Sequence, residues 1–296
     1  MDKYLDSSNE IKTVVFPVAG LGSRFLPVTK LVAKELLPIL NKPLIEYAVS
    51  EAIKAGIERF IFISSPDKQP ITNYFRKNKK LENELREKNS EYLDIISNNI
   101  IPEENLIEVI QDKPLGLGHA IWCAKDYISG PFAVILPDDL VVSDAPCIKQ
   151  MIDVYKKHKC NIIAIQEVDN NNISKYGVID FLNNDQNIYH VRDMIEKPDQ
   201  EKAPSNLAVI GRYILSPNIM KELSVLKAGF GGEIQLTDAI KNSINSENVI
   251  GYKFEGNRFD CGNVMGALEA QLSIAINNDK YKDQVIEIIN KNLIKD

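Results

Sequence analysis

The chain has 296 residues, a formal net charge of −6 and a pI near 5.3. It is long enough for one large α/β domain with an appended subregion, or for two smaller domains. Binding to nucleic acid or to an anionic membrane depends on broad positive potential, so the negative balance argues against both partners. No apolar run reaches the length of a membrane span, and residues 1–10 lack the apolar stretch of a secretory signal. We therefore expect a cytoplasmic protein with no membrane partner.

Strand-like and helical segments alternate through the first half of the chain, which is typical of a mostly parallel sheet covered by helices. The expected strands are Thr13–Pro17, Arg59–Ser64, Leu106–Gln111, Phe132–Leu136 and Asn161–Glu167. The expected helices cover about Pro43–Ala55, Arg76–Glu91, His119–Tyr127 and Pro146–Lys159. Charges of both signs crowd the second of these helices, so we expect it to be a solvated excursion.

The second half of the chain changes character after about residue 168. Segments at Val178–Leu182, Ile188–Glu196 and Leu207–Leu215 predict a sheet with hairpins, because polar turns separate them. From Gly232 onward we expect mainly helices, with one strand; the helices lie near Val264–Ile276 and Tyr281–Ile294, and the strand at about Val249–Phe254. We expect one domain over residues 1–296, divided into parts at about 10–168, 169–262 and 263–296.

The loop after the first expected strand reads VAGLGSRFLPVTKLVAKELLPI. Gly20 and Gly22 let the backbone approach an anion without interference from a Cβ atom. Three cations follow with a single acid among them: Arg24, Lys30 and Lys34, with the acid Glu35. Backbone N–H groups beside concentrated positive charge favour a polyphosphate, so the loop predicts a phosphate site. The alternative is a glycine turn followed by a solvated basic loop.

Two familiar nucleotide signatures do not fit this loop. A dinucleotide fingerprint needs a third glycine where Phe25 stands, and a P-loop needs a glycine followed by lysine and a hydroxyl residue. A second candidate feature is the pair Asp138 and Asp139, which follows the expected strand Phe132–Leu136. Open α/β sheets bind ligands at the carboxyl ends of their strands, so this position favours function over a turn or a helix cap.

The motif AGLGSRFLPVTK, with the pair Lys34–Glu35 after it, resembles the signature of the sugar nucleotidyltransferase family. Later blocks resemble those of the bacterial UTP–glucose-1-phosphate uridylyltransferases in that family: QDKPLGLGHAI, LPDDL, KYGVI, MIEKP, GGEIQLTDAI and FDCGN. Together they span Thr13 to about Ile276, in the family's order. The chain departs from the pattern at Ser23, where threonine is usual, and at Ala33, where proline is common. The second departure leaves the path of Lys34 open.

The resemblance implies a Rossmann-like α/β nucleotidyltransferase fold, with a mixed, mainly parallel central sheet and an additional β-rich sugar-binding region. Residues of about 10–168 would form the nucleotide-binding half and about 169–262 the sugar-phosphate-binding half. The helices of about 263–296 would contact a second copy in a homo-oligomer, a dimer or a tetramer. The apolar residues of the last helix, such as Ile288 and Ile289, could equally belong to the core.

The chemistry that the resemblance implies is Mg²⁺-assisted attack of glucose 1-phosphate on the α-phosphorus of UTP, which gives UDP-glucose and pyrophosphate. Both substrates are polyanions, and two like charges about 4 Å apart repel by roughly 4 kcal/mol at an effective dielectric near 20. Such a transfer needs alignment and charge neutralisation rather than a covalent protein group. The alternatives are a relative that uses dTTP, CTP or ATP, and a non-catalytic regulatory homologue.

Carried over from the family, four residues would perform the chemistry. Arg24 and Lys34 would clamp the triphosphate, and Lys197 would neutralise the glucose phosphate. Asp138 and Asp260 would bind Mg²⁺, which takes one or two carboxylates in addition to phosphate oxygens. The remaining nucleotide contacts would come from Ala19, Gly20, Gly22, Glu35, Gln111 and Gly116.

Some of these nucleotide assignments have alternatives. Gln111 can offer both an acceptor and donors to the edge of uracil, and Gly116 can add backbone contacts. Glu35 could instead pair with Lys34 or cap the next element. His119, in GLGHA, is expected to begin a helix rather than to act as an acid or a base.

On the sugar side, the resemblance implies Gly177, Glu196 and Lys197. Glu196 would accept hydrogen bonds from sugar hydroxyls. Adjacent residues on a strand face opposite sides, so the chain must bend for Glu196 and Lys197 to reach one ligand, and Pro198 favours a bend. Without the resemblance, an exposed ion pair would explain Glu196 and Lys197, and a turn would explain Gly177.

Overall fold

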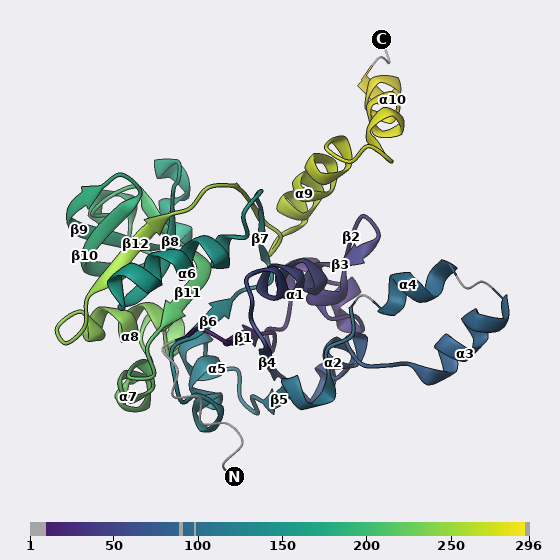
Figure 1. Ribbon diagram of the computed structural model, residues 1–296. Coiled ribbons are helices and arrows are strands. Elements are labelled where there is room, and N and C mark those ends of the chain that lie inside the picture. The colour runs from purple at the N-terminus through teal and green to yellow at the C-terminus, as the bar shows by residue number, and fades with distance from the viewer. Residues whose placement is uncertain (1–9, 89–90, 98, 294–296) are drawn as a thin grey trace.

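A run of β-branched and aromatic residues makes β1 (Thr13–Pro17) a buried inner strand. The computed structural model describes residues 10–88, 91–97 and 99–293. Within these residues β1 belongs to a nine-stranded sheet of order β5-β4-β1-β6-β11-β8-β12-β10-β9 (Figure 1). The other strands of this sheet are β4 (Arg59–Ser64), β5 (Leu106–Ile110), β6 (Phe132–Ile135), β8 (Asn161–Glu167), β9 (Gly177–Asp185), β10 (Ile188–Glu196), β11 (Leu207–Leu215) and β12 (Val249–Lys253).

The sheet is mixed, and most of its strands share one direction. β4, β5 and β6 run parallel with β1, and β12 runs parallel with β8. β11 is antiparallel to both β6 and β8, and β10 is antiparallel to both β12 and β9. This arrangement confirms the expected α/β class with a mixed, mainly parallel sheet and a β-rich second part.

Helices cover both faces of the sheet. Apolar side chains of β1 point alternately to one face and to the other, so both faces offer an apolar surface on which helices pack. Val14 and Phe16 pack on one face with α1 (Leu44–Lys54) and α6 (Cys147–His158). Val15 packs on the other face with three helices, α5 (Leu117–Cys123), α7 (Ile219–Val225) and α8 (Leu236–Ser243). The period of two along a strand thus creates two separate cores, one on each side.

A second, two-stranded sheet joins distant parts of the chain. β7 (Asp139–Val142) pairs antiparallel with β13 (Asn257–Asp260), and Asp139 lies opposite Asp260. The sequence analysis did not predict either strand. Their pairing brings Asp260 next to the end of β6, where Asp138 stands. A third small sheet pairs β2 (Pro38–Ile39) with β3 (Lys42–Pro43).

Two helical segments project from the body of the protein (Figure 1). The first contains α3 (Lys79–Lys88) and α4 (Glu91–Ser97), none of whose described residues is buried, as expected of a solvated excursion. It follows the short α2 (Pro70–Tyr74), which was not predicted. The second contains α9 (Val264–Ile276) and α10 (Lys282–Leu293). None of the described helices combines the length and the apolar character that a membrane span requires.

Most predicted elements have the expected bounds to within two residues. The expectations about residues 1–9, about residues 89–90 and about the last helical residue, Ile294, lie outside the described residues. The excursion expected at Arg76–Glu91 is divided between α3 and α4, and the helix expected at His119–Tyr127 begins earlier, at Leu117.

A buried ion pair ties the sheet to α1 and α6. Arg212 of β11 is 1% exposed, and its Nη2 donates to Oε2 of Glu51, in α1, over 2.8 Å. Arg212 Nη1 donates to the carbonyl oxygens of Leu136 and Gly211, over 3.0 and 3.1 Å. The backbone N–H of Ile148, in the first turn of α6, donates to Glu51 Oε1 over 3.0 Å. The pair therefore fixes four segments just behind the end of β6.

We predict that Glu51→Gln lowers the free energy of unfolding by about 3–5 kcal/mol, because it removes the negative charge that is hydrogen-bonded to the buried Arg212 guanidinium group. Urea unfolding measures this change. Glu167→Gln is the control, since it removes one partner of an exposed ion pair with Lys253 and should leave the urea midpoint unchanged. Equal midpoints for Glu51→Gln and the control would contradict the prediction.

Candidate functional site

A cavity of about 560 Å³ lies where β6, β10 and β13 end. It contains most of the side chains that the sequence assigned to catalysis, to the sugar phosphate and to the metal: Arg24, Asp138, Gly177, Glu196, Lys197 and Asp260. The carboxyl ends of strands are where open α/β sheets bind ligands. The residues assigned to the nucleotide lie outside the lining of this cavity, in the loop after β1 and at the end of β5.

Lys34 reaches into the site and pairs with Asp138. Its Nζ donates to Asp138 Oδ2 over 2.5 Å, so the side chain is directed at the end of β6 even though Ala33 precedes it. Burial by itself would raise the pKa of Asp138, but the charge of Lys34 and its hydrogen bond outweigh burial and lower that pKa. Burial likewise opposes the charge on Lys34, but Asp138 raises the pKa of Lys34 above its usual value. Both groups are therefore ionised at neutral pH.

Asp138, Asp260 and Arg24 converge around Gly262. A Cβ atom on Gly262 would lie 2.9 Å from Asp260 Oδ1, 3.1 Å from Asp138 Oδ2 and 3.2 Å from Arg24 Nη1. Any side chain at this position would therefore displace the two carboxylates and the guanidinium group. The pairing of β7 with β13 sets this geometry, since it places residues 139 and 260 opposite each other.

A left-handed residue brings the two neighbours Glu196 and Lys197 into one cavity. β10 ends at Glu196, and Lys197 has a φ of +45°, with its N–H donating to the Tyr176 carbonyl over 3.0 Å. This backbone conformation breaks the strand alternation, so the bend that the sequence analysis required is present at Lys197. Lys197 Nζ lies 3.6 Å from Glu196 Oε1.

Thr237 and Gly177 complete the surroundings of Glu196. Thr237 Oγ1 donates to Glu196 Oε2 over 2.6 Å. A Cβ atom on Gly177 would lie 3.1 Å from both Glu196 Oε2 and Thr237 Oγ1. Gly177 begins β9 opposite Glu196, so it provides space for the carboxylate rather than a turn. The sequence analysis did not assign Thr237 to the site.

A second network of charged residues supports the pairing of β7 with β13. Arg258 Nε donates to Asp139 Oδ1 over 2.6 Å, and Arg258 Nη1 donates to the Tyr176 hydroxyl over 2.8 Å. Asp139 Oδ2 accepts from the Gly211 N–H over 2.8 Å. Burial raises the pKa of Asp139, although Arg258 opposes the shift. Both aspartates line the cavity, but Asp139 is bound to Arg258 and to the Gly211 backbone, whereas Asp138 pairs with Lys34.

Lys68 supports the glycine loop, and the sequence analysis missed it. Lys68 Nζ donates to the carbonyl oxygens of Val18 (2.9 Å) and Gly20, and to Glu35 Oε2 over 2.9 Å. Glu35 is 1% exposed, and its burial raises its pKa although Lys68 and Lys34 oppose the shift. Its ion pair is with Lys68 rather than with Lys34, the partner that the sequence analysis had considered.

Lys68 lies in a polar loop after β4, with a sequence, SSPDKQP, that carries no local sign of this role. The glycine loop itself contains the left-handed residue Gly22, with a φ of +67°. Gly20 has no heavy atom within 4 Å of an added Cβ position, so the backbone there is open to a ligand.

Gln111 follows β5, and its amide group is engaged within the protein. Nε2 lies 3.3 Å from the Gly116 carbonyl oxygen and 2.9 Å from His119 Nδ1. Gly116 has a φ of +102°, and a Cβ atom there would meet Glu233 Cβ at 2.7 Å. Gly116 thus fits this position because of its backbone conformation and its close packing.

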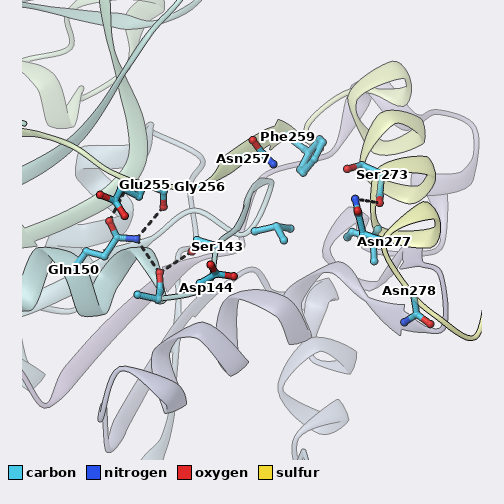
Figure 2. Close-up of a pocket in the computed structure, with 13 residues that line it drawn as sticks. Ser143, Asp144, Gln150, Glu255, Gly256, Asn257, Phe259, Ser273, Asn277 and Asn278 are labelled. Carbon is cyan, nitrogen blue, oxygen red and sulfur yellow. Dashed lines mark hydrogen bonds between the residues drawn. The ribbon is translucent and has the colours of Figure 1, made fainter. Parts of the chain in front are cut away.

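A separate cavity of about 590 Å³ lies between the loop after β7, the β12–β13 connection and α9 (Figure 2). Gln150 lines this cavity, and its Nε2 donates to the carbonyl oxygens of Ala145 and Glu255, over 2.8 and 2.9 Å. Among the described residues, those that line this cavity include Asp144 and Glu255 but no lysine or arginine. It therefore lacks the cations that a polyphosphate requires.

Comparisons with known proteins agree with the geometry. A family model described as nucleotidyl transferase matches residues 14–276. UTP–glucose-1-phosphate uridylyltransferase 2 of Staphylococcus saprophyticus is 43% identical over 285 residues, which cover 95% of this chain and 98% of that protein. A UDP-glucose pyrophosphorylase complexed with UDP-glucose superposes with a TM-score of 0.81 at 43% identity, covering 90% of this chain and 100% of the other. A UTP-bound UGPase from Acinetobacter baumannii gives a TM-score of 0.85 at 38% identity, covering 96% and 100%.

The family model, the sequence similarity over nearly the full length and the shared fold all indicate the same family. The chain therefore belongs to the nucleotidyl transferase family and, within it, to the UTP–glucose-1-phosphate uridylyltransferases, as its motifs predicted.

Proposed function

We propose that the chain transfers the uridylyl group of UTP to glucose 1-phosphate, with release of pyrophosphate. The observation that carries this proposal is the arrangement around one cavity. Arg24, two carboxylates, Glu196 and Lys197 all line this cavity, and Lys34 pairs with one of those carboxylates, Asp138. The names of the similar proteins and their complexes with UDP-glucose and UTP support the same reaction.

On the nucleotide side, we propose that Arg24 and Lys34 hold the triphosphate and its departing pyrophosphate. The backbone of Ala19, Gly20 and Gly22 would approach the phosphates. Two further residues, Gln111 and Gly116, would contact the base. We assign Glu35 a supporting role, because it is buried against Lys68 beneath the loop.

On the sugar side, Lys197 would neutralise the glucose phosphate and Glu196 would accept hydrogen bonds from sugar hydroxyls. Lys197 keeps 39% of its side chain exposed, so the ammonium group is accessible to an incoming anion. Neutralisation of both anions would let the phosphate oxygen of the sugar approach the α-phosphorus in line with the leaving group.

Asp138 and Asp260 are the residues that would hold Mg²⁺. They fit the ion because Asp138 is ionised and both carboxylates border the same glycine. Within the described part of the chain no cluster of three or more potential metal ligands occurs. Mg²⁺ usually takes one or two carboxylates and completes its coordination with phosphate oxygens and water, so the proposal requires only these two side chains. When bound, Mg²⁺ would stabilise the negative charge of the phosphates.

The division of labour along the chain stays a proposal as well. We assign the nucleotide to about residues 10–168 and the sugar phosphate to about 169–262, on the basis of where the named side chains lie. The cytoplasmic location and the absence of nucleic-acid partners expected from the sequence also stay predictions.

The experiment that tests the function incubates the purified protein with Mg²⁺, glucose 1-phosphate and one nucleoside triphosphate at a time. We expect rapid pyrophosphate release with UTP and slower release with dTTP, CTP or ATP. Faster release with another triphosphate would show that the enzyme prefers a nucleotide other than UTP. Absence of release with all of them would refute the enzymatic proposal.

We predict that Asp138→Asn lowers kcat by about 100-fold or more, because it removes one of the two carboxylates that would hold Mg²⁺ beside the reacting phosphates. Steady-state kinetics with UTP measure this effect, and thermal unfolding checks that the fold is retained. Asp144→Asn, which changes a carboxylate in the other cavity, is the matched control and should keep normal turnover. Near-normal kcat for Asp138→Asn would remove this residue from the catalytic set.

We predict that Lys197→Ala raises the KM for glucose 1-phosphate by about 10- to 100-fold, since charge-assisted hydrogen bonds contribute about 1.5–3 kcal/mol. The KM for UTP should change much less. Lys202→Ala, which removes an exposed lysine a short distance along the chain, is the control. A parallel rise in both KM values would place Lys197 elsewhere than on the sugar phosphate.

We predict that the chain forms a homo-oligomer through the arm of α9 and α10. α9 is apolar around most of its circumference, and it leaves Val264, Met265 and Leu268 exposed on a projecting segment (Figure 1). Exposed apolar patches of this kind mark association surfaces. Sedimentation velocity should detect a dimer or a tetramer, which Met265→Glu together with Leu268→Glu should dissociate. A monomeric wild-type protein would contradict the prediction.

A further inference from the structure

Gln111, the residue that we propose reads the base, has its amide group held by two acceptors. Nε2 lies 2.9 Å from His119 Nδ1 and 3.3 Å from the Gly116 carbonyl oxygen. An amide nitrogen carries two hydrogens, so two acceptors use both of them. The other amide atom, Oε1, has no hydrogen-bond partner among the residues that the structure describes. Gln111 is 5% exposed, so its surroundings rather than water decide its orientation.

The Gly116 carbonyl determines which way the amide group points. A backbone carbonyl oxygen can only accept a hydrogen bond, so the amide atom next to it must be the nitrogen. His119 Nδ1 faces the same nitrogen and must then be an acceptor as well. This requires a neutral imidazole ring whose hydrogen is on Nε2. If Nδ1 carried a hydrogen, this N–H donor would face the N–H donor on Gln111 Nε2. That arrangement would favour a Gln111 amide group turned the other way.

The surroundings of His119 favour this neutral form. Burial lowers the pKa of His119, and the nearby Lys125 ammonium lowers it further. The imidazole ring stacks on Trp122, with ring centroids 6.1 Å apart, which holds it in place on α5. Cys123 Sγ lies 3.9 Å from His119 Nδ1. The ring is therefore a fixed acceptor on the first turns of a short helix.

We propose that His119 is a positioning residue for base selection: it orients the Gln111 amide so that a carbonyl oxygen, not an amino group, meets the base. This inference rests on the proposed function, in which Gln111 contacts the base. An acceptor suits uracil and thymine, whose N3 carries a hydrogen. It opposes cytosine, whose unprotonated N3 is itself an acceptor. His119 thereby contributes to the choice of UTP over CTP without contacting either.

Two substitutions of nearly equal shape separate the acceptor from the bulk of the ring. Asn places an oxygen close to the position of Nδ1 and can still accept from Gln111, whereas Leu places a methyl group there. For His119→Leu we expect the KM for UTP to rise about three- to tenfold, the range that the loss of one net hydrogen bond predicts, with kcat little changed. The preference for UTP over CTP, as the ratio of kcat/KM values, should fall by a similar factor. His119→Asn should restore most of both.

A spectroscopic measurement tests the same inference without turnover. Proteins labelled with ¹⁵N at histidine report which ring nitrogen carries the hydrogen. We expect Nδ1 of His119 to be unprotonated at neutral pH in the wild type. A hydrogen on Nδ1 would overturn the inference, whatever the kinetics show.

The kinetic outcomes distinguish this inference from the proposed function. If the wild type releases no pyrophosphate with UTP, the proposed function fails. The ¹⁵N measurement of the His119 ring then remains as the test of how the Gln111 amide group is oriented. If the wild type is active and both variants keep its preference for UTP over CTP, the inference is wrong. If Leu and Asn impair the enzyme equally, the ring acts through packing, which also overturns the inference.

Discussion

The pairing of β7 with β13 is the constraint on which the rest of the site depends. It joins segments about 120 residues apart in the chain and places Asp139 opposite Asp260. Because side chains alternate along a strand, a slip of one residue would turn Asp260 away from Asp138. Arg258, on β13, binds Asp139 at the start of β7, and Asp139 also accepts from the Gly211 backbone, so the register is tied to the central sheet.

Ion pairs within the protein hold the charged residues of the site in place before any substrate arrives. Lys34 lies against Asp138, and Lys68 against Glu35. In an acidic protein, local pairs of this kind provide cations for a polyanion without a broad positive surface. They also explain why neighbouring acids differ: the pKa of Asp138 is lowered beside Lys34, whereas burial raises the pKa of Asp139. Asp138 is therefore suited to binding a cation in the cavity, and Asp139 to a structural ion pair with Arg258.

The sequence predicted those parts of the fold that local patterns determine. β1, β4, β10, β11 and α9 have the expected bounds, because apolar periodicity and turn residues define them within a few neighbours. β7 and β13 were missed, since each has only four residues and their pairing depends on distant chain. The same reason applies to Arg258 and Lys68. Their partners lie 119 and 33 to 50 residues away, and neither residue has a local pattern that indicates its role.

The glycines show most clearly what a sequence alone leaves open. Gly116 and Gly22 have positive φ values, so their backbone conformation favours glycine. Gly177 and Gly262 have no such conformation, and both are small because carboxylates occupy the space of a side chain. In sequence all four look alike, and a turn explains each of them equally well. Only the position of Glu196 beside Gly177, and of Asp138 and Asp260 beside Gly262, separates the two causes. The shape of the cavity is therefore set as much by the side chains that are absent as by those that carry charge.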